Sequence, residues 1–146
     1  MSVHYLEDFT PGQTFGSGRL VVDEERALGF AAEFDPQPFH LDEEAARRTI
    51  FGGLAASGWH TAAMTMRLLV DSEFKPAGGI VGAGFEELRW PRPVRPGDEL
   101  RVAGEVLEVR PSRSRPGQGV RVTTLNQNNE PVQVFVANLI VLRRPG

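Results

Sequence analysis

The stretch LAASGWHTAAMTMRLLV, residues 54–70, is the longest apolar segment of the chain. Its apolar side chains cover nearly every face of a helix, and a helix of that kind is buried on most sides. Ser57, His60 and Arg67 interrupt the segment too often for it to span a membrane. In a small domain, a sheet wrapped around the helix achieves such burial. Residues 54–70 therefore predict a long central helix enclosed by a sheet.

The rest of the chain supplies the other elements. Asp23 is a typical N-cap for a helix that Pro36 ends, and Asp42 caps a second short helix over residues 43–49. Strand-like runs separated by turn compositions cover residues 15–22, 80–90, 99–109, 119–126 and 132–143. The last run is apolar on both faces, as in a central or interface strand. Early helices followed by an antiparallel meander predict an α+β domain.

Length and composition narrow the class of protein. The 146 residues predict one domain, residues 1–146, that is long enough for a hydrophobic core. With 16 basic and 19 acidic residues the formal charge is −3, which argues against a general nucleic-acid or membrane-surface binder. The absence of cysteine excludes disulfides and thiolate catalysis. The N-terminal residues lack the basic and apolar regions of a signal peptide, so we expect a cytoplasmic protein.

The sequence DPQPFH at residues 35–40 carries the candidate chemistry. Each proline fixes its own φ and disfavours the helical region for the residue before it, so we expect a non-helical turn here. Such a turn can direct Asp35 and His40 toward one point, where a carboxylate and an imidazole form an acid/base pair near neutral pH. The alternative is structural: Asp35 ends a helix and holds a turn, and His40 is a half-buried packing residue.

Asp-x-x-Pro-x-His followed by an acidic, alanine-rich helix resembles the hydratase motif of the MaoC-like dehydratases, or (R)-specific enoyl-CoA hydratases. Two further segments resemble this family in the same order, FGGLAASG at residues 51–58 and RPVRPGD at residues 92–98. Gln37 and Phe39 depart from the usual pattern, since the family more often has Asn and a smaller aliphatic residue at these positions. Neither departure removes a proton carrier.

The resemblance implies a hot-dog fold, with the long helix rolled inside a curved antiparallel sheet. It also implies a hydro-lyase that adds or removes water across the α,β double bond of an enoyl-CoA or (R)-3-hydroxyacyl-CoA thioester. Asp35 is then the principal base and His40 its partner in proton transfer. The Gly58 N–H, free in the first helical turn, is the expected donor to the thioester oxygen, and Ser57 orients an active-site side chain. The alternative for Ser57 and Gly58 is a plain helix start.

Other candidate residues are less specific. Phe39 and Trp59 are candidates for an acyl pocket, and the bulk of Phe39 favours a short or altered one. Arg110, Arg113 and Arg115 are candidate ligands of CoA phosphates, because guanidinium groups bind phosphate in a bidentate manner. The alternative for these arginines is a solvated hairpin loop. We expect no metal ion, and no cofactor beyond the coenzyme A carried by the substrate.

Two other functions remain open on the same fold. An acyl-CoA thioesterase is expected to carry a lone catalytic carboxylate on the central helix, and residues 54–70 contain none. A non-catalytic acyl-thioester-binding subunit has no need of both Asp35 and His40. The last strand is apolar on both faces, and this feature together with the resemblance predicts a homodimer, or a hexamer built of dimers. Loop 111–118 of one chain is then expected to complete the site of the other.

Overall fold

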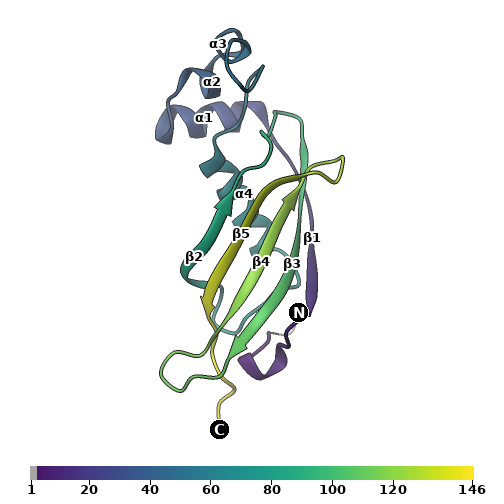
Figure 1. Ribbon diagram of the computed structural model, residues 1–146, viewed down its shortest axis with the longest axis vertical. Helices are drawn as coiled ribbons and strands as arrows, with labels where there is room; N and C mark the ends of the chain where they lie inside the picture. Colours follow the sequence, from purple (N-terminus) through teal and green to yellow (C-terminus); the bar gives the residue numbers. More distant parts are fainter. Residues whose placement is uncertain (1–2) are drawn as a thin grey trace.

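A computed structural model describes residues 3–146 of the chain. Five strands form one sheet in the order β1-β3-β4-β5-β2, and all neighbouring strands are antiparallel (Figure 1). The strands are β1 (Thr14–Val21), β2 (Val81–Arg89), β3 (Glu99–Arg110), β4 (Gly117–Leu125) and β5 (Pro131–Ile140). The helical elements are η1 (Leu6–Asp8), α1 (Glu24–Phe34), α2 (Pro38–Leu41), α3 (Glu43–Arg47) and α4 (Gly58–Val70). The predicted α+β architecture is confirmed.

The sheet curves because its pairing is interrupted at several points. Register shifts occur in the β1–β3, β2–β5 and β3–β4 pairs, and such bulges bend a strand and increase its twist. β5 lies between β4 and β2 and is buried along most of its length, which confirms it as a central strand. β2 is an edge strand and is exposed along nearly all of its length.

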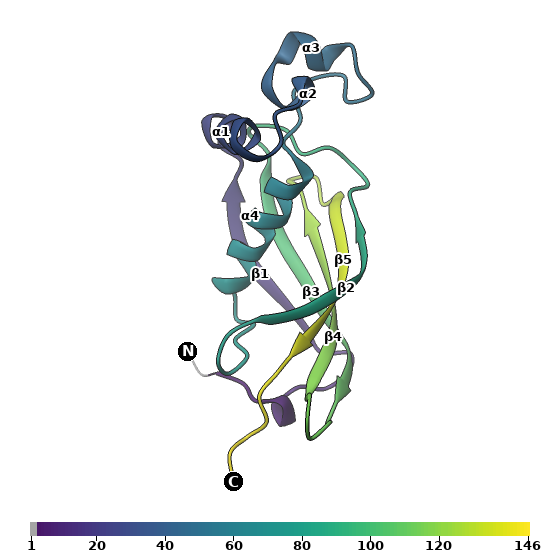
Figure 2. The ribbon, with the colours of Figure 1, turned by 90° about the vertical axis from the view of Figure 1, so that its left-hand side faces the viewer.

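Helix α4 packs on one face of this sheet (Figure 2). Its inward side chains join those of the sheet in the main core, which includes Met64, Leu68, Leu69, Leu100, Val102 and Val122. The opposite face of the helix is open: Trp59, Met66 and Val70 are 59%, 42% and 48% exposed. The central helix is therefore confirmed, but the prediction that it is buried on most sides is wrong for the single chain.

Gly58 lies in the first turn of the helix, as predicted, although the apolar segment begins at residue 54. α4 starts at Gly58 because the side chain of Ser57 accepts a hydrogen bond from the Trp59 N–H and so caps it. Residues 54–56 precede it as buried, non-helical chain. Ser57 is fully buried, so this cap lies inside the protein.

The three short helices gather at one end of the sheet, beside the start of α4 (Figures 1 and 2). Asp23 caps α1 as predicted, by accepting a hydrogen bond from the Arg26 N–H. The prediction that residues 35–40 are not helical is wrong in part, because Pro38 begins the single turn of α2. Proline is favoured at the first position of a helix, where its missing N–H costs nothing.

The helices in the described part of the chain include none that is long and apolar enough to cross a membrane.

Candidate active site

Asp35 and His40 stand on either side of a sharp change in chain direction. Asp35 is the C-cap of α1, where its N–H donates to the Ala31 carbonyl. Pro36 then ends the helix, and α2 begins at Pro38 and carries His40 in its only turn. The two side chains therefore come from different helices and converge, as the sequence predicted for Asp35 and His40.

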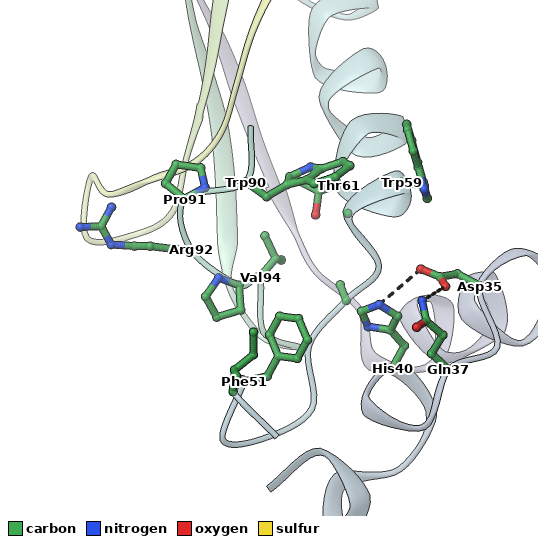
Figure 3. Close-up of a pocket in the computed structure, with 14 residues that line it drawn as sticks. Asp35, Gln37, His40, Phe51, Trp59, Thr61, Trp90, Pro91, Arg92 and Val94 are labelled. Atoms are coloured by element: carbon green, nitrogen blue, oxygen red, sulfur yellow. Dashed lines mark hydrogen bonds and ion pairs between the residues drawn. The ribbon is translucent and has the colours of Figure 1, made fainter. Parts of the chain in front are cut away.

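The Asp35 carboxylate lies at the centre of a small cluster of polar side chains (Figure 3). Its Oδ2 is 3.3 Å from His40 Nε2 and accepts a hydrogen bond of 2.7 Å from the Ser57 hydroxyl. Its Oδ1 accepts a hydrogen bond of 2.5 Å from the Gln37 amide. Only 15% of the Asp35 side chain and 7% of the His40 side chain are exposed. The pair is therefore largely shielded from solvent while still reaching a cavity.

A backbone carbonyl fixes the orientation of the His40 ring. His40 Nδ1 lies 2.6 Å from the Ala55 carbonyl oxygen, which can only accept, so we assign the proton to Nδ1. In the neutral ring Nε2 then carries a lone pair and faces Asp35 Oδ2. A neutral ring therefore presents a second acceptor beside Oδ2, so that one water molecule can donate to both atoms, whereas a protonated ring donates from Nε2–H to Oδ2 directly. In both cases the carboxylate and the imidazole share one exchangeable proton.

The environment of Asp35 favours its ionised form. Burial is the largest single influence and raises the pKa of this carboxyl. The hydrogen bonds from Gln37 and Ser57 and the attraction of His40 act in the opposite direction, and together they hold the pKa of Asp35 below its ordinary value. At neutral pH the group is therefore a carboxylate that can accept a proton.

The first turn of α4 presents a free amide next to this pair. The Ser57 hydroxyl accepts from the Trp59 N–H, and the Ser57 carbonyl accepts from the N–H groups of His60 and Thr61. The Gly58 N–H has no hydrogen-bond partner within residues 3–146. Because the helix dipole places partial positive charge at this end, the Gly58 N–H is suited to an oxygen that gains negative charge.

The glycine at position 58 is required by a neighbouring indole. A Cβ atom on Gly58 would lie 2.6 Å from Cε2 of Trp90, which is far too close for any side chain. Trp90 follows β2 directly, and its ring also contacts Trp59 edge to face. The absence of a side chain at Gly58 thus serves the packing of Trp90, in addition to leaving the N–H open to the cavity.

A cavity of about 430 Å³ opens beside these groups. Asp35 and His40 lie on one side of it, and Pro91 and Arg92 lie on the other (Figure 3). The remaining lining includes Gln37, Ile50, Phe51, Gly58, Trp59, Thr61, Trp90 and Val94. The carboxylate, the imidazole and the free amide therefore face one common space.

The structure brings together most of the predicted site residues. Asp35, His40, Gly58 and Trp59 line the cavity, and Ser57 lies behind it with its hydroxyl on Asp35. These placements agree with the predicted positions of the site residues.

Phe39 is placed differently from the prediction. It is adjacent to His40 in the single turn of α2, so its side chain points in another direction and does not line the cavity. Its ring packs edge to face on His40, with centroids 4.6 Å apart, and also contacts Phe51. Phe39 therefore supports the His40 ring and the cavity wall from behind.

The predicted arginine cluster lies far from the cavity within one chain. Arg110 ends β3, and Arg113 and Arg115 follow in the β3–β4 loop, at the end of the sheet opposite to α1, α2 and α3 (Figure 1). β3 runs away from the site, so its C-terminal loop cannot reach it. The arginine that lines the cavity is Arg92, which belongs to the RPVRPGD segment already noted in the sequence.

Sequence reasoning did not identify Trp90 as part of the site. Trp90 and Gly58 are far apart in the chain, and their contact depends on how β2 packs against α4. In the sequence, Gln37 is only a departure from the usual Asn, although an amide side chain two residues from Asp35 is a candidate hydrogen-bond partner for its carboxylate.

An α-helix packed on a curved antiparallel sheet, with an acid/base pair at the helix start, places the protein in the hot-dog class. The family model described as a MaoC like domain matches residues 8–129. The chain belongs to this MaoC-like family.

Individual relatives and solved structures agree with this assignment. The crystal structure of the MaoC-like dehydratase from Rhodospirillum rubrum is 55% identical, with a TM-score of 0.93, and the match covers 98% of this chain and 99% of that one. Uncharacterized protein YdeM of Bacillus subtilis (strain 168) is 38% identical over 94% of this chain and 96% of its own length. The 3-hydroxybutyryl-CoA dehydratase of Methylorubrum extorquens is 34% identical over 79% of this chain and 71% of its own length. The predicted hot-dog fold and family are thus confirmed.

Proposed function

We propose that this protein is a hydro-lyase that adds water to an enoyl-CoA, or removes it from the corresponding (R)-3-hydroxyacyl-CoA. The observation that carries the proposal is the pair of proton acceptors, Asp35 Oδ2 and His40 Nε2, held 3.3 Å apart beside the free Gly58 N–H. The family membership and a relative named 3-hydroxybutyryl-CoA dehydratase support the same reaction class.

In the proposed hydration, Asp35 and His40 hold one water molecule in the cavity. Asp35 accepts a proton from this water as the water oxygen bonds to the β-carbon. The electron pair of the double bond moves toward the α-carbon and the thioester oxygen. The acid/base pair then returns the proton to the α-carbon, so that one H and one OH have been added and the site is unchanged. Dehydration follows the same steps in reverse.

The thioester oxygen gains negative charge when the β-carbon is attacked. The Gly58 N–H, at the positive end of α4, is the donor that we assign to this oxygen. Donors of this kind contribute roughly 2.7–4 kcal/mol to lowering a barrier. Coenzyme A enters as part of the substrate, and the proposed reaction uses no other cofactor and no metal ion.

We infer that two copies of the chain form a homodimer through the open face of α4 and the edge of β2. A two-fold axis perpendicular to the sheet would pair β2 with its copy in antiparallel fashion and place the two α4 helices side by side. This operation turns the partner end for end. It would bring the partner's β3–β4 loop, with its Arg113 and Arg115, toward the cavity end of this chain, where CoA phosphates would lie.

The test follows the loss of conjugated enoyl-thioester absorbance with crotonyl-CoA. We expect rapid loss with the wild type and at least about a hundredfold slower loss with Asp35→Asn and with His40→Ala, since general acid–base catalysis contributes that much or more. Asp71→Asn and His4→Gln are matched controls: Asp71 pairs with Arg67 on the surface, and His4 lies outside the cavity. Both controls should retain wild-type rates.

Two results would contradict the proposal. Release of free thiol from saturated acyl-CoAs, without loss of enoyl absorbance, would identify a thioesterase. Absence of both reactions, together with binding of acyl-CoAs in calorimetry, would identify an acyl-thioester-binding subunit.

A further inference from the structure

We propose that a hydrogen-bonded layer formed by Trp90, Gln133, Thr65 and Thr124 closes the catalytic cavity on its inner side and restricts the enzyme to short acyl groups. We call these four residues the partition. The inference rests on the proposed function, since it assumes that an acyl thioester occupies the cavity.

The partition connects the cavity wall to the buried interior. The Trp90 indole Nε1–H donates to Gln133 Oε1 at 2.8 Å, and Gln133 Nε2 donates to Thr65 Oγ1 at 3.0 Å. Thr65 Oγ1 is 2.6 Å from Thr124 Oγ1. Gln133, Thr65 and Thr124 are all fully buried, whereas Trp90 is 41% exposed. A surface indole is thus anchored by a buried polar chain.

A second cavity, which we call the inner cavity, lies on the other side of this layer. It is lined by apolar side chains and glycines of α4, β2, β4 and β5, among them Met66, Leu69, Phe85, Val122 and Phe135, and its volume is about 40 Å³.

The partition lies between the two cavities along three elements. Along α4, Gly58, Trp59 and Thr61 line the catalytic cavity, Thr65 belongs to the partition, and Met66 and Leu69 line the inner cavity. Along β5 the order is Gln133, then Phe135, Ala137 and Leu139 of the inner cavity. The inner cavity contacts β2 at Gly82, Gly84 and Phe85, and the catalytic cavity reaches Trp90 at the end of the same strand. The partition therefore separates two spaces that lie in line along the helix.

An acyl chain cannot pass this layer without breaking it. The polar atoms that link Trp90 to Thr124 are paired, and a buried donor or acceptor that loses its partner is costly. A methylene chain offers no replacement hydrogen bonds. The indole also packs closely on Gly58, where an added Cβ would lie 2.6 Å from its Cε2. The acyl group must therefore end before the partition.

The experiment compares kcat/KM for crotonyl-CoA and for trans-2-octenoyl-CoA. The wild type should strongly favour crotonyl-CoA. Trp90→Ala removes the indole and joins the two cavities, so the octenoyl-to-crotonyl ratio of kcat/KM should rise at least about tenfold, since each methylene newly buried favours binding by roughly fourfold.

A second variant tests the partition without leaving a buried polar group unpaired, and so without the same risk of misfolding. The double variant Trp90→Phe with Gln133→Leu removes both partners of one hydrogen bond, so neither is left unpaired, and it leaves Thr65 paired with Thr124. It should shift the ratio in the same direction. Trp59→Ala removes the other indole of the same cavity. It takes away an edge-to-face contact of Trp90 but none of the hydrogen bonds of the partition, and should leave the ratio within about twofold of wild type while changing KM for both substrates.

Calorimetric titration with butyryl-CoA and octanoyl-CoA separates this inference from the proposed function. If the wild type hydrates neither enoyl-CoA, the proposed function fails, but the two saturated thioesters still test the partition. The partition is supported if Trp90→Ala binds octanoyl-CoA more tightly than butyryl-CoA and the wild type does not. Equal preference for both chain lengths in the wild type, or an unchanged ratio in both partition variants, would overturn it.

Discussion

Asp35 is oriented by side chains that come from three different parts of the chain. Gln37 holds Oδ1 from the turn after α1, Ser57 holds Oδ2 from the N-cap of α4, and His40 approaches Oδ2 from α2. A carboxylate with so many fixed neighbours loses little freedom when a water molecule binds. Its position and its ionisation are thus fixed by its neighbours within the folded chain.

Replacing Gln37 with Leu should raise the pKa of Asp35. The Gln37 hydrogen bond stabilises the ionised carboxylate and lowers its pKa, so its removal favours the protonated form and moves protonation to higher pH. If Asp35 is the base, the acidic limb of the kcat/KM profile should move to higher pH as well. The carboxyl ¹³C shift of Asp35, followed by NMR against pH, gives the same comparison without activity.

Gln13→Leu is the control for this change, because Gln13 is exposed and lies outside the cavity. An unchanged Asp35 titration in Gln37→Leu would show that the amide does not stabilise the carboxylate.

The residues of the site were predictable to different degrees. Asp35 and His40 could be found because two prolines fix the chain between them, so their convergence depends on local geometry. Phe39 was misplaced because the single turn of α2 decides which neighbour faces the cavity, and Pro38 can begin a turn as well as prevent one. The contact of Trp90 with Gly58 is set by packing between distant elements, which no local pattern encodes.

At the scale of elements, Arg95 fixes the segment that leads into α4. Its guanidinium donates to the carbonyls of Gly53 at 2.7 Å and Leu54 at 3.1 Å, and also to that of Phe51. The Ala56 N–H donates to the Val94 carbonyl nearby. The β2–β3 connection thus holds the cavity wall that carries Phe51.

Arg95→Lys should destabilise the protein by roughly 1.5–3 kcal/mol, because an ammonium cannot reach three carbonyls in the planar arrangement of a guanidinium. Urea unfolding measures this change. Arg67→Lys is the control, since Arg67 forms only an exposed ion pair with Asp71 and should change stability by about 0.5 kcal/mol or less. Equal effects of both substitutions would contradict the role of Arg95.

The Ser57 hydroxyl makes two hydrogen bonds, one that caps α4 and one to Asp35, and substitutions can test them separately. Ser57→Ala removes the cap of α4 and should cost about 1 kcal/mol of stability, whereas Ser57→Gly retains most of the capping preference and should cost only a few tenths. Both remove the hydroxyl that donates to Asp35, so both should lower kcat/KM for crotonyl-CoA to a similar extent. Thermal melts and initial rates on the same samples test this. Recovery of activity in Ser57→Gly would show that the hydroxyl matters only to the helix.

The strands were predictable because each alternating or continuous run of apolar residues is flanked by residues that are typical of turns. The family resemblance is what placed Gly58 in the first turn of α4. The apolar pattern alone does not locate the start of this helix, because it continues back through residues 54–56. Those residues are buried by contacts with α2 and the β2–β3 connection, such as the hydrogen bond from the Ala55 N–H to the Phe39 carbonyl. Burial alone does not distinguish such a segment from a helix.

At the scale of the molecule, the single chain leaves an apolar stripe uncovered. Trp59, Ala63, Met66 and Val70 are exposed on α4 at helical spacing, and Phe85 is exposed on the neighbouring edge strand β2. An open strand edge beside exposed apolar side chains favours association. The apolar periodicity of residues 54–70 is thus explained if a second copy covers this stripe.

Met66→Glu should therefore convert a dimer into a monomer. A carboxylate left unpaired in an apolar interface costs roughly 3 kcal/mol or more, which raises the dissociation constant by at least about a hundredfold. Sedimentation velocity measures the change. Ala32→Glu, on the exposed surface of α1, adds the same charge and should leave the dimer intact. A wild type that sediments as a monomer would exclude the proposed pairing.

The Ser57 hydroxyl joins the start of α4 to the carboxylate of Asp35. Fraying of that first turn on warming would release the hydroxyl from the carboxylate while the sheet is still folded. If Asp35 is the base, such a local opening would limit turnover at a temperature below that at which the core melts. Heat should stop turnover reversibly before it unfolds the molecule, and cooling should restore it.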